Sequence, residues 1–431
     1  MTNRENYQKR LGTLEGALAL VKSGDTIAAG LYGNEPKEFL MNLHRIGHRV
    51  VDVHLWTMLM TDDYPAMKDN SLVGKIDVRT SFYNAFCRNG HHTGRFHFYP
   101  MHLQSLGEGT AEADRPTVFV AAVSPMDEQG NVYLSFDLEG TLEWLDAADT
   151  VIFEINDQIP KVYGETAVPI TAADYIYEAS YPIPLAPEPP STDVDKRIAE
   201  NVASLIKDGD CIQLGIGGIP NAVGMTLLDK KDLGIHSEMI TSSMGLLMRK
   251  GVVTNERKTI HRGKTIGGFA WGDEALYEFM AENPMIEMHR SFYVNDPFII
   301  AQNDNFVSVN AALSVDLTGQ VCSESFGPRQ YSGTGGASDF AYGAYRSRGG
   351  RGIIAIASTA KGGTISKIQP VLPAGSVVSI SRNIVDHVVT EYGIAKLRNR
   401  SIRQRVDALI SIAHPDFRKD LRKEAENLML W

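Results

Sequence analysis

The fold is decided by residues 21–33, whose sequence VKSGDTIAAGLYG returns in similar form as IKDGDCIQLGIGG at residues 206–218. The offset between the two copies, measured from Lys22 to Lys207, is 185 residues. In each copy an amphipathic segment leads into a Gly-Asp turn, a short apolar segment and a glycine-rich loop, an order that indicates helix, turn, strand and loop. An internal repeat of this kind predicts a chain built from two domains of similar topology.

Further apolar segments place the chain in the α/β class. Residues 117–123 and 352–357 are short and apolar and are separated from their neighbours by amphipathic segments, which predicts a parallel sheet in each half. Residues 149–156 and 376–383 share an apolar centre and a polar end, so we expect a buried strand late in each half. Ligands of such sheets bind beyond the carboxyl ends of the strands.

A proline-rich stretch marks the domain boundary. Residues 181–190, YPIPLAPEPP, contain five prolines, which cannot lie inside a helix or a central strand. Ser191, Thr192 and Asp193 come next and can cap a helix that opens the second half. We therefore predict one α/β domain over residues 1–190, ending in a linker at 181–190, and a second over residues 191–431. The last stretch, residues 401–430, has helical spacing.

Length, composition and charge exclude several classes of protein. A chain of 431 residues with 43% hydrophobic and 22% charged residues is typical of a globular protein of two or three domains. A net charge of −10 argues against a nucleic-acid or anionic-membrane partner, and no apolar run approaches the ~18 residues of a membrane-spanning helix. Cys87, Cys211 and Cys322 are odd in number and far apart, and residues 1–10 lack an apolar run, so we expect a cytoplasmic protein.

Two glycine-rich loops are candidates for binding an anion. Residues 215–223, GIGGIPNAV, follow a predicted strand and precede a predicted helix, so their amides can face an anion or a developing oxyanion. Residues 332–340, SGTGGASDF, carry three glycines in four positions and can form an anion-holding concavity. A tight strand-to-helix turn explains the first loop equally well, and a flexible surface loop is the alternative for the second.

One carboxylate, Glu238, lies in a predicted strand at residues 234–240. The alternation of a strand places His236, Glu238 and Ile240 on the same side. A carboxylate on a buried strand costs free energy unless it is paired or lies at the exposed end of the strand. A solvated loop acid is nevertheless the more common explanation for such a residue.

The sequence lacks the motifs of metal sites and of serine or cysteine hydrolases. The histidines at positions 91, 92, 97 and 102 do not pair with a cysteine or carboxylate at the spacing of a zinc or iron site, so no metal site is expected. A Gly-x-Ser-x-Gly elbow and a local cysteine signature are also missing, which argues against a serine or cysteine hydrolase.

Six segments, in the order in which they occur, closely resemble the acetyl-CoA hydrolase/transferase family, and within it the 4-hydroxybutyrate and butyryl-CoA:acetate CoA-transferases. The segments are residues 213–223, 234–239, 293–297, 316–321, 333–340 and 389–395. The resemblance covers nearly the whole chain and is strongest from about residue 195 to residue 415.

The resemblance implies two α/β domains of similar topology with the active site at their interface. It implies coenzyme A as a substrate with no permanently bound cofactor and no metal, acyl-CoA and short carboxylates as small-molecule partners, and a homodimer or tetramer. Glu238 matches the nucleophilic glutamate of the family. The residues that match the loops for the oxyanion and for CoA are Gly215, Gly217, Gly218, Ile219, Gly333, Gly335 and Gly336.

The implied reaction moves CoA from a short-chain acyl-CoA, such as 4-hydroxybutyryl-CoA or butyryl-CoA, to acetate or a similar carboxylate. It is a ping-pong exchange through a glutamyl-CoA thioester. Two alternatives remain open: an acyl-CoA hydrolase that uses the same glutamate, and a non-catalytic binding protein on this fold. The chain departs from the family pattern at Ser242 and Ser243, where relatives often carry Asp-Gly, and at Ala337, where many carry Gln.

Overall fold

The structure is a computed structural model that describes residues 2–187 and 190–430. Contacts divide the chain into two units, one comprising Met1–Ala186 with Ile266–Val294 and the other Pro187–Thr265 with Asn295–Trp431. Glu188 and Pro189 of the predicted linker lie outside the described residues. The two-domain division at residue 190 stays a prediction, and the contacts place residues 266–294, from its second half, in the first unit.

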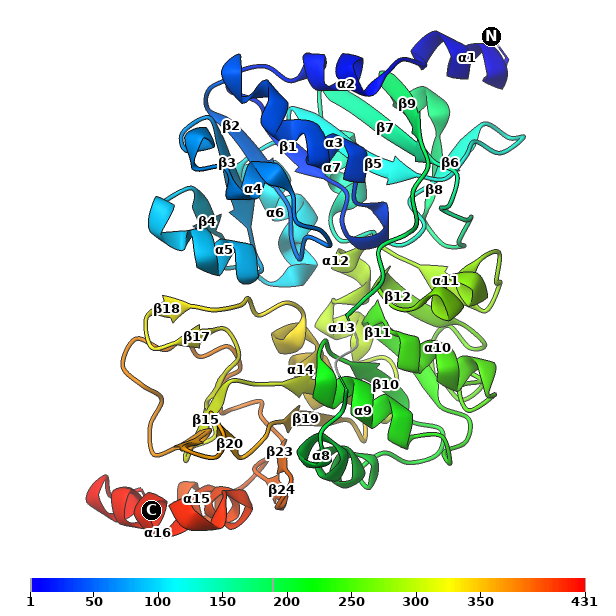
Figure 1. The fold of residues 1–431 in the computed structure, drawn as a ribbon. Helices are drawn as coiled ribbons and strands as arrows, with labels where there is room; N and C mark the ends of the chain where they lie inside the picture. The colour runs from blue at the N-terminus through cyan, green and yellow to red at the C-terminus, as the bar shows by residue number, and fades with distance from the viewer. Residues whose placement is uncertain (1, 188–189, 431) are drawn as a thin grey trace. The chain divides into compact units, whose positions relative to one another are not determined.

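The first unit contains a seven-stranded sheet in the order β4-β3-β2-β1-β5-β7-β9, and every neighbouring pair is parallel (Figure 1). The strands are β1 (Thr26–Ala29), β2 (Val53–Trp56), β3 (Ile76–Thr80), β4 (Phe96–Phe98), β5 (Val118–Val123), β7 (Thr150–Asn156) and β9 (Tyr175–Ala179). On β2 and β3 buried apolar side chains alternate with partly exposed polar ones, so one face of this half of the sheet packs into the core.

Helices and a short antiparallel pair of strands, β6 with β8, complete the first unit. They are α1 (Asn3–Arg10), α2 (Leu14–Leu20), α3 (Lys37–Asn42), α4 (Pro65–Lys68), α5 (Ala85–Gly90), α6 (Leu106–Ala113), β6 (Asn131–Tyr133), α7 (Thr141–Ala147) and β8 (Ala167–Pro169). The segment around residues 266–294 adds β12 (Thr265–Ala270), α11 (Glu274–Met280), β13 (Ile286–Met288) and α12 (Ser291–Val294). Phe269 of β12 stacks on Tyr32 at 3.9 Å between ring centroids, so this late segment is part of the unit's apolar core.

The second unit repeats the arrangement with strands in the order β11-β10-β14-β19-β23-β24. They are β10 (Cys211–Leu214), β11 (Gly234–Ile240), β14 (Phe306–Ala311), β19 (Arg351–Ala355), β23 (His387–Thr390) and β24 (Gly393–Lys396). Each neighbouring pair is parallel up to β23, and β24 closes the edge as an antiparallel strand. The repeat at residue 206 therefore builds the same central strand as the repeat at residue 21.

Helices and a second, small sheet surround these strands. The helices are α8 (Asp193–Ala203), α9 (Gly218–Thr226), α10 (Ser242–Arg249), α13 (Pro297–Ile300), α14 (Ala337–Arg346), α15 (Ile402–Ile412) and α16 (Pro415–Asn427). The small sheet has the order β16-β15-β22, with β15 (Ser314–Asp316), β16 (Val321–Cys322) and β22 (Ile368–Gln369), and β17 (Ser325–Phe326) pairs with β18 (Arg329–Gln330). The remaining short pair is β20 (Thr359–Ala360) with β21 (Ile365–Ser366).

The predicted fold class is confirmed, because both units are α/β with parallel central strands. The expectation of a buried strand at residues 376–383 is wrong. Of its side chains Val377 and Val378 are 40% and 43% exposed, and Ile380 forms only an isolated bridge with Val321. The strand that matches β7 in the sheet order is β19. The helices expected over residues 401–430 are present as α15 and α16, and Pro415 begins the second of them.

Candidate active site

Glu238 is the fifth residue of β11 and lies toward the carboxyl end of that strand. The strand order turns at the neighbouring β10, because the chain continues to β11 on one side of it and to β14 on the other. In parallel α/β sheets such a reversal opens a crevice at the carboxyl ends of the strands. The topology therefore places Glu238 beside the position where a ligand of the second unit is expected.

The Glu238 carboxyl accepts hydrogen bonds from two residues that follow it in the chain. Asn295 Nδ2 donates to Glu238 Oε2 at 2.9 Å, and the main-chain N–H of Gly336 donates to the same carboxyl. A Cβ atom on Gly336 would overlap Glu238 Oε2, so only glycine leaves room for the carboxyl at this distance. The oxygen Oδ1 of Asn295 is buried without a hydrogen-bond partner, which leaves an acceptor beside the carboxyl.

Burial raises the pKa of Glu238 from its ordinary value of 4.5 to about 7. The hydrogen bond from Asn295 acts in the opposite direction, the nearby carboxylate of Asp339 adds to the rise, and the Gly336 N–H again lowers the pKa. Asp339 is 1% exposed and lies in the first turn of α14. A carboxyl with this pKa is available in its ionised form near neutral pH, which a nucleophile requires.

The first glycine-rich loop connects β10 to α9. The N–H of Gly215 donates to the Val309 carbonyl at 2.8 Å, and a Cβ on Gly215 would approach Asn310 Oδ1 to 2.9 Å, so the loop leaves the sheet at a close backbone approach. Gly217 has φ +121°, a conformation that favours glycine, and it precedes Gly218, the first residue of α9. A Cβ on either Gly217 or Gly218 would meet nothing within 4 Å.

This loop therefore presents helix amides to open space. No side chain caps the first turn of α9. The main-chain N–H groups of its first residues, including Gly218 and Ile219, therefore do not donate to a capping side chain. An uncapped helix start preceded by glycine is suited to hold a negative charge.

The second glycine-rich loop leads into α14. Gly333 and Gly336 are buried, Gly335 has φ +53°, and Gly336 is the residue that precedes the helix. The structure brings this loop to Glu238 through Gly336. The first loop lies at the end of the strand next to the one that carries Glu238.

The residues around Glu238 that the sequence did not single out are Asn295 and Asp339. Both lie inside segments that carry the family resemblance, but only the folded chain brings them to the carboxyl. Their type is a usable signal, because a buried polar side chain in an apolar environment requires a partner.

The two departures from the family pattern have defined positions. Ser242 and Ser243 open α10 directly behind β11, and Thr241 Oγ1 caps that helix by accepting from the Met244 N–H at 3.3 Å. A Cβ on Gly224 would overlap the hydroxyl of Ser243, so α9 and α10 pack closely here. Ala337 is the first residue of α14 and is half-buried.

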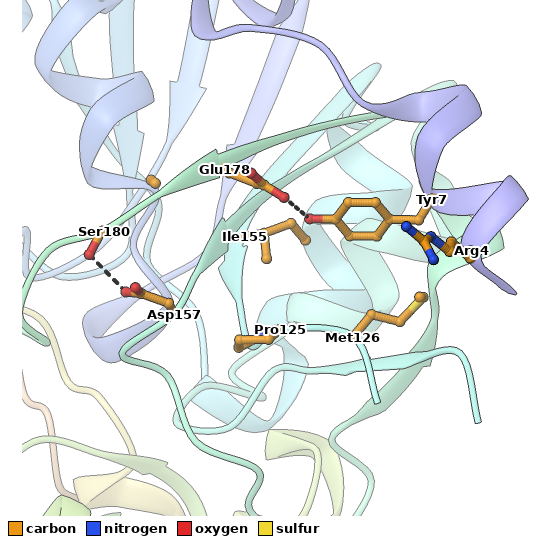
Figure 2. Close-up of a pocket in the computed structure, with 9 residues that line it drawn as sticks. Arg4, Tyr7, Pro125, Met126, Ile155, Asp157, Glu178 and Ser180 are labelled. Atoms are coloured by element: carbon orange, nitrogen blue, oxygen red, sulfur yellow. Dashed lines mark hydrogen bonds between the residues drawn. The ribbon is translucent and has the colours of Figure 1, made fainter. Parts of the chain in front are cut away.

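The first unit carries a separate pocket of about 630 Å³ at the carboxyl ends of β5, β7 and β9 (Figure 2). Tyr7 of α1 donates to Glu178 Oε1 at 2.7 Å, and Ser180 donates to Asp157 Oδ1 at 2.9 Å. Arg4 is the cation among the lining residues. Because both carboxylates already accept hydrogen bonds within the pocket, these contacts stabilise the end of the sheet.

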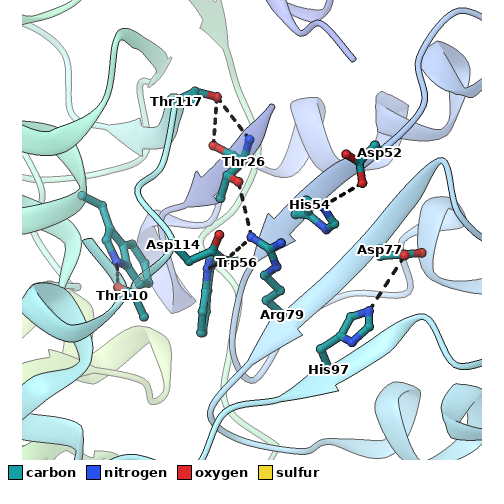
Figure 3. Close-up of polar contacts among 11 residues, drawn as sticks. Thr26, Asp52, His54, Trp56, Asp77, Arg79, His97, Thr110, Asp114 and Thr117 are labelled. Carbon is teal, nitrogen blue, oxygen red and sulfur yellow. Dashed lines mark hydrogen bonds and ion pairs between the residues drawn. The ribbon is translucent and has the colours of Figure 1, made fainter. Parts of the chain in front are cut away.

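The histidines considered as metal ligands have other surroundings. His91 Nδ1 lies 2.7 Å from the Tyr83 hydroxyl. His97 of β4 lies 3.9 Å from Asp77 of β3, and His54 of β2, which was not a candidate, lies 3.1 Å from Asp52 (Figure 3). The same view shows Arg79 paired with Asp114. Among residues 2–187 and 190–430, no three His, Cys, Asp or Glu side chains converge in a way that could hold a metal ion. Within the same residues no helix has the length and apolar character needed to cross a bilayer.

Comparison with known proteins gives consistent matches. The N-terminal domain of the acetyl-CoA hydrolase/transferase family matches residues 1–187, and its C-terminal domain matches residues 272–425. A succinyl-CoA:cyclohexane-1-carboxylate CoA transferase of Geobacter metallireducens is 42% identical over 98% of this chain and 97% of its own. A 4-hydroxybutyrate coenzyme A transferase of Clostridium kluyveri is 39% identical over 97% and 98%.

Solved structures agree with this match over the full length. The crystal structure of RipA from Yersinia pestis superposes with a TM-score of 0.94 at 35% identity and covers 100% of both chains. A more distant relative is an acetyl-CoA hydrolase of Candida glabrata, which is 24% identical over 75% of this chain and 70% of its own.

Proposed function

The chain belongs to the acetyl-CoA hydrolase/transferase family, and on that premise we propose that it is a CoA-transferase with Glu238 as its nucleophile. One observation carries the proposal: Asn295 and Gly336 hold the Glu238 carboxyl at the end of β11, with its pKa raised to about 7. The proposed donor is a short-chain acyl-CoA, 4-hydroxybutyryl-CoA or butyryl-CoA, and the proposed acceptor is acetate or a similar carboxylate.

The first half of the proposed reaction opens the thioester. The ionised Glu238 oxygen attacks the thioester carbonyl carbon and forms a tetrahedral oxyanion. Collapse of this species breaks the carbon–sulfur bond, and the CoA thiolate leaves with the electron pair, so the product is an acyl-glutamyl anhydride. The thiolate then attacks the carbonyl carbon of Glu238, and the acyl group departs as a free carboxylate. The result is a glutamyl-CoA thioester.

The second half runs the same steps in reverse. An incoming carboxylate attacks the glutamyl-CoA thioester, the thiolate leaves, and it then attacks the carbonyl of the new acyl group. The new acyl-CoA departs and Glu238 returns as a carboxylate. Because one thioester is exchanged for another, the proposed reaction needs no ATP, no metal and no permanently bound cofactor.

The oxyanion steps require hydrogen-bond donors that add no formal charge. The amides of Gly217, Gly218 and Ile219 in the first loop, and of Gly335 and Gly336 in the second, are the proposed donors. Donors of this kind, fixed before the reaction, typically contribute about a hundredfold to a thousandfold each. The open space over Gly217 and Gly218 supports this role, since a bound thioester needs room above the amides.

Water has to be kept from the anhydride, because hydrolysis would return both acids and free CoA. A hydrolase is therefore the second candidate, and the hydrolase relative in Candida glabrata supports considering it. The two functions share Glu238 and differ in the molecule that reacts with the covalent intermediate, which is a carboxylate in the transferase and water in the hydrolase. Dependence on an added carboxylate separates them.

The decisive experiment is intact-protein mass spectrometry after incubation with butyryl-CoA, followed by borohydride reduction and peptide mapping. We expect a CoA adduct that reduction converts to an alcohol at residue 238, and no adduct in Glu238→Gln. CoA release without acetate and without an adduct would favour the hydrolase. An adduct that persists in Glu238→Gln would overturn the assignment of the nucleophile.

A further inference from the structure

A buried carboxylate outside both glycine-rich loops, Glu324, is tied to the second of them. It lies between β16 and β17 and is 4% exposed. It also lies outside the segments on which the family resemblance depends. A buried carboxylate is costly unless hydrogen bonds satisfy it, so its partners indicate its role.

The carboxyl of Glu324 accepts from two hydroxyls on different segments. Thr334 Oγ1 donates to Oε1 at 2.7 Å, and Ser379 Oγ donates to the same oxygen at 2.8 Å. Thr334 belongs to the second glycine-rich loop, whereas Ser379 receives the Ser323 N–H at 2.9 Å and so is fixed to the strand region before Glu324. The carboxyl therefore bridges the loop to an anchored part of the unit.

The main chain of Glu324 holds the same loop at its start. The Glu324 carbonyl accepts from the N–H groups of Tyr331 at 2.8 Å and Ser332 at 3.0 Å. Three groups of the loop between Tyr331 and Thr334, two main-chain N–H groups and one hydroxyl, thus donate hydrogen bonds to Glu324. Two residues further on lies Gly336, whose N–H meets the Glu238 carboxyl.

We propose that Glu324 is a positioning residue that holds the loop at residues 331–336 where Gly336 meets the nucleophilic carboxyl. Glu324 acts through the loop and does not touch the reacting atoms. The inference rests on the proposed function, since it assigns a role relative to Glu238 as the nucleophile.

The groups that face Glu238 determine the effect of loosening the loop. They are the Asn295 amide, the Gly336 N–H and the Asp339 carboxylate. When the loop moves, the Gly336 N–H no longer stabilises the ionised carboxyl, while the repulsion from Asp339 remains. The proportion of ionised Glu238 at a given pH then falls, so the acid limb of the pH–rate profile moves to higher pH.

The test compares Glu324→Ala with Glu324→Gln. The alanine variant removes the acceptor of both hydroxyls, and we expect the acid limb to rise by about one pH unit and kcat to fall about tenfold to a hundredfold with little change in KM. The glutamine variant keeps an acceptor oxygen for Thr334 and Ser379, so it should retain the normal profile. Thr334→Val removes only the hydroxyl on the loop and should give a smaller shift in the same direction.

A matched control is available in Asp316 of β15, a buried carboxylate that accepts from Thr318 and Gln320 and fixes a turn. Asp316→Ala is expected to lower Tm without moving the acid limb. An equal shift of the limb in Asp316→Ala, or an unmoved limb in both Glu324→Ala and Thr334→Val, would overturn the positioning role. If Glu324→Ala fails to fold, Thr334→Val and Glu324→Gln still decide the matter.

A carbon-13 NMR titration of the Glu238 carboxyl, assigned by its loss in Glu238→Gln, makes the result independent of turnover. A higher pKa of the Glu238 carboxyl in Thr334→Val supports the positioning role even if no covalent adduct forms. An adduct that forms together with an unshifted titration leaves the proposed function intact and refutes the role of Glu324.

Discussion

The two units have equivalent central strands and differ in the side chains at the carboxyl ends of those strands. Thr26 of β1 pairs with His54 of the next strand, and its repeat counterpart Cys211 of β10 pairs with Gly234. Four residues beyond these partners stand Met58 in the first unit and Glu238 in the second. Met58 is 3% exposed and accepts from the Ser81 hydroxyl at 2.8 Å, so the position that carries the carboxylate in one unit belongs to the core in the other.

The loops after β1 and β10 differ in the same way. The N–H of Leu31 donates at 2.8 Å to Asp137, a buried carboxylate of the first unit, and Gly33 is covered by Phe136. Their counterparts are Ile216, which is 38% exposed, and Gly218, above which a Cβ would meet nothing within 4 Å. In the first unit the loop amide of Leu31 already donates to a carboxylate of the protein itself. In the second unit the space above Gly218 is open.

The duplicated framework therefore does not determine where the proposed chemistry lies. The same helix-turn-strand-loop sequence ends in a packed and satisfied loop in one case and in an open loop beside a carboxylate in the other. Fold alone is therefore a poor guide to function here, and the side chains at the strand ends decide it.

The largest effect on activity is expected for Glu238→Gln. The amide keeps the shape of the side chain but cannot act as the nucleophile, so we expect transfer to fall by at least about a thousandfold. Thermal unfolding should show a Tm no lower than that of the wild type at pH 8, because a costly buried charge is removed. Transfer above a few per cent of the wild-type rate would refute the difference between the two units.

Paired glycine substitutions separate packing from activity. Gly33→Ala would place a Cβ 2.7 Å from the Phe136 ring, and we expect a loss of about 1–3 kcal/mol in the free energy of unfolding. Gly218→Ala should leave that free energy within about 0.5 kcal/mol but lower kcat/KM about tenfold, because its methyl group enters the space proposed for the thioester. Denaturant unfolding and steady-state kinetics on both variants measure the two effects, and a Gly218→Ala protein with undiminished kcat/KM would contradict the proposed use of the open loop.

Stability should depend on pH through Glu238. Its pKa in the folded chain, about 7, lies above its ordinary value of 4.5, so the folded state binds the extra proton between these values. As a result, the free energy of unfolding falls as pH rises from about 4.5 to about 7, and below 4.5 the penalty is gone. The penalty is at most about 3 kcal/mol and is reduced by the partial exposure of the side chain.

Other buried acids act in the same direction. The pKa of Glu35 is raised to about 7 and that of Asp137 to about 6, in both cases mainly by burial. The contribution of Glu238 is therefore measured as the difference between wild type and Glu238→Gln in denaturant unfolding from pH 4.5 to pH 8. A difference that stays constant over this range would show that Glu238 is not the titrating group.

The smallest effect is expected for Met58→Leu. A volume-conserving exchange in the core should change the free energy of unfolding by less than about 1.5 kcal/mol and leave kcat/KM within about twofold. Equilibrium unfolding and kinetics check it, and a loss of activity as large as that of Glu238→Gln would show that the two positions are not different in kind.

Local pattern sufficed for most of the fold. The repeated Gly-Asp turn with its apolar strand predicted β1 and β10, and the spacing after Ser401 predicted α15, because these signals lie within one element. The prediction of a buried strand at residues 376–383 was wrong because two adjacent valines resemble a buried strand in sequence. Both valines are in fact exposed to a large extent. Whether an apolar pair is covered depends on segments distant along the chain, which periodicity does not report.

The site was harder to predict for the same reason. Glu238 was identified through the family resemblance, since a lone acid at a strand end is uninformative by itself. The contacts of Asn295 and Glu324 join distant parts of the sequence: Asn295 and Glu238 are 57 residues apart, and Ser379 and Glu324 are 55 apart. The two-domain prediction with its active site at a domain interface remains a prediction.

The path of the chain between the units has a consequence for synthesis on the ribosome. The first unit contains residues up to Ala186 and then Ile266–Val294, so its last segment emerges roughly a hundred residues after the rest. At about 5–20 residues per second, the early part waits about 5–20 seconds for it. Throughout that interval Tyr32 lacks Phe269, the ring that stacks on it in the finished protein. The nascent chain therefore exposes an incomplete core for seconds. At this stage the exposed apolar surface is available for a chaperone to bind.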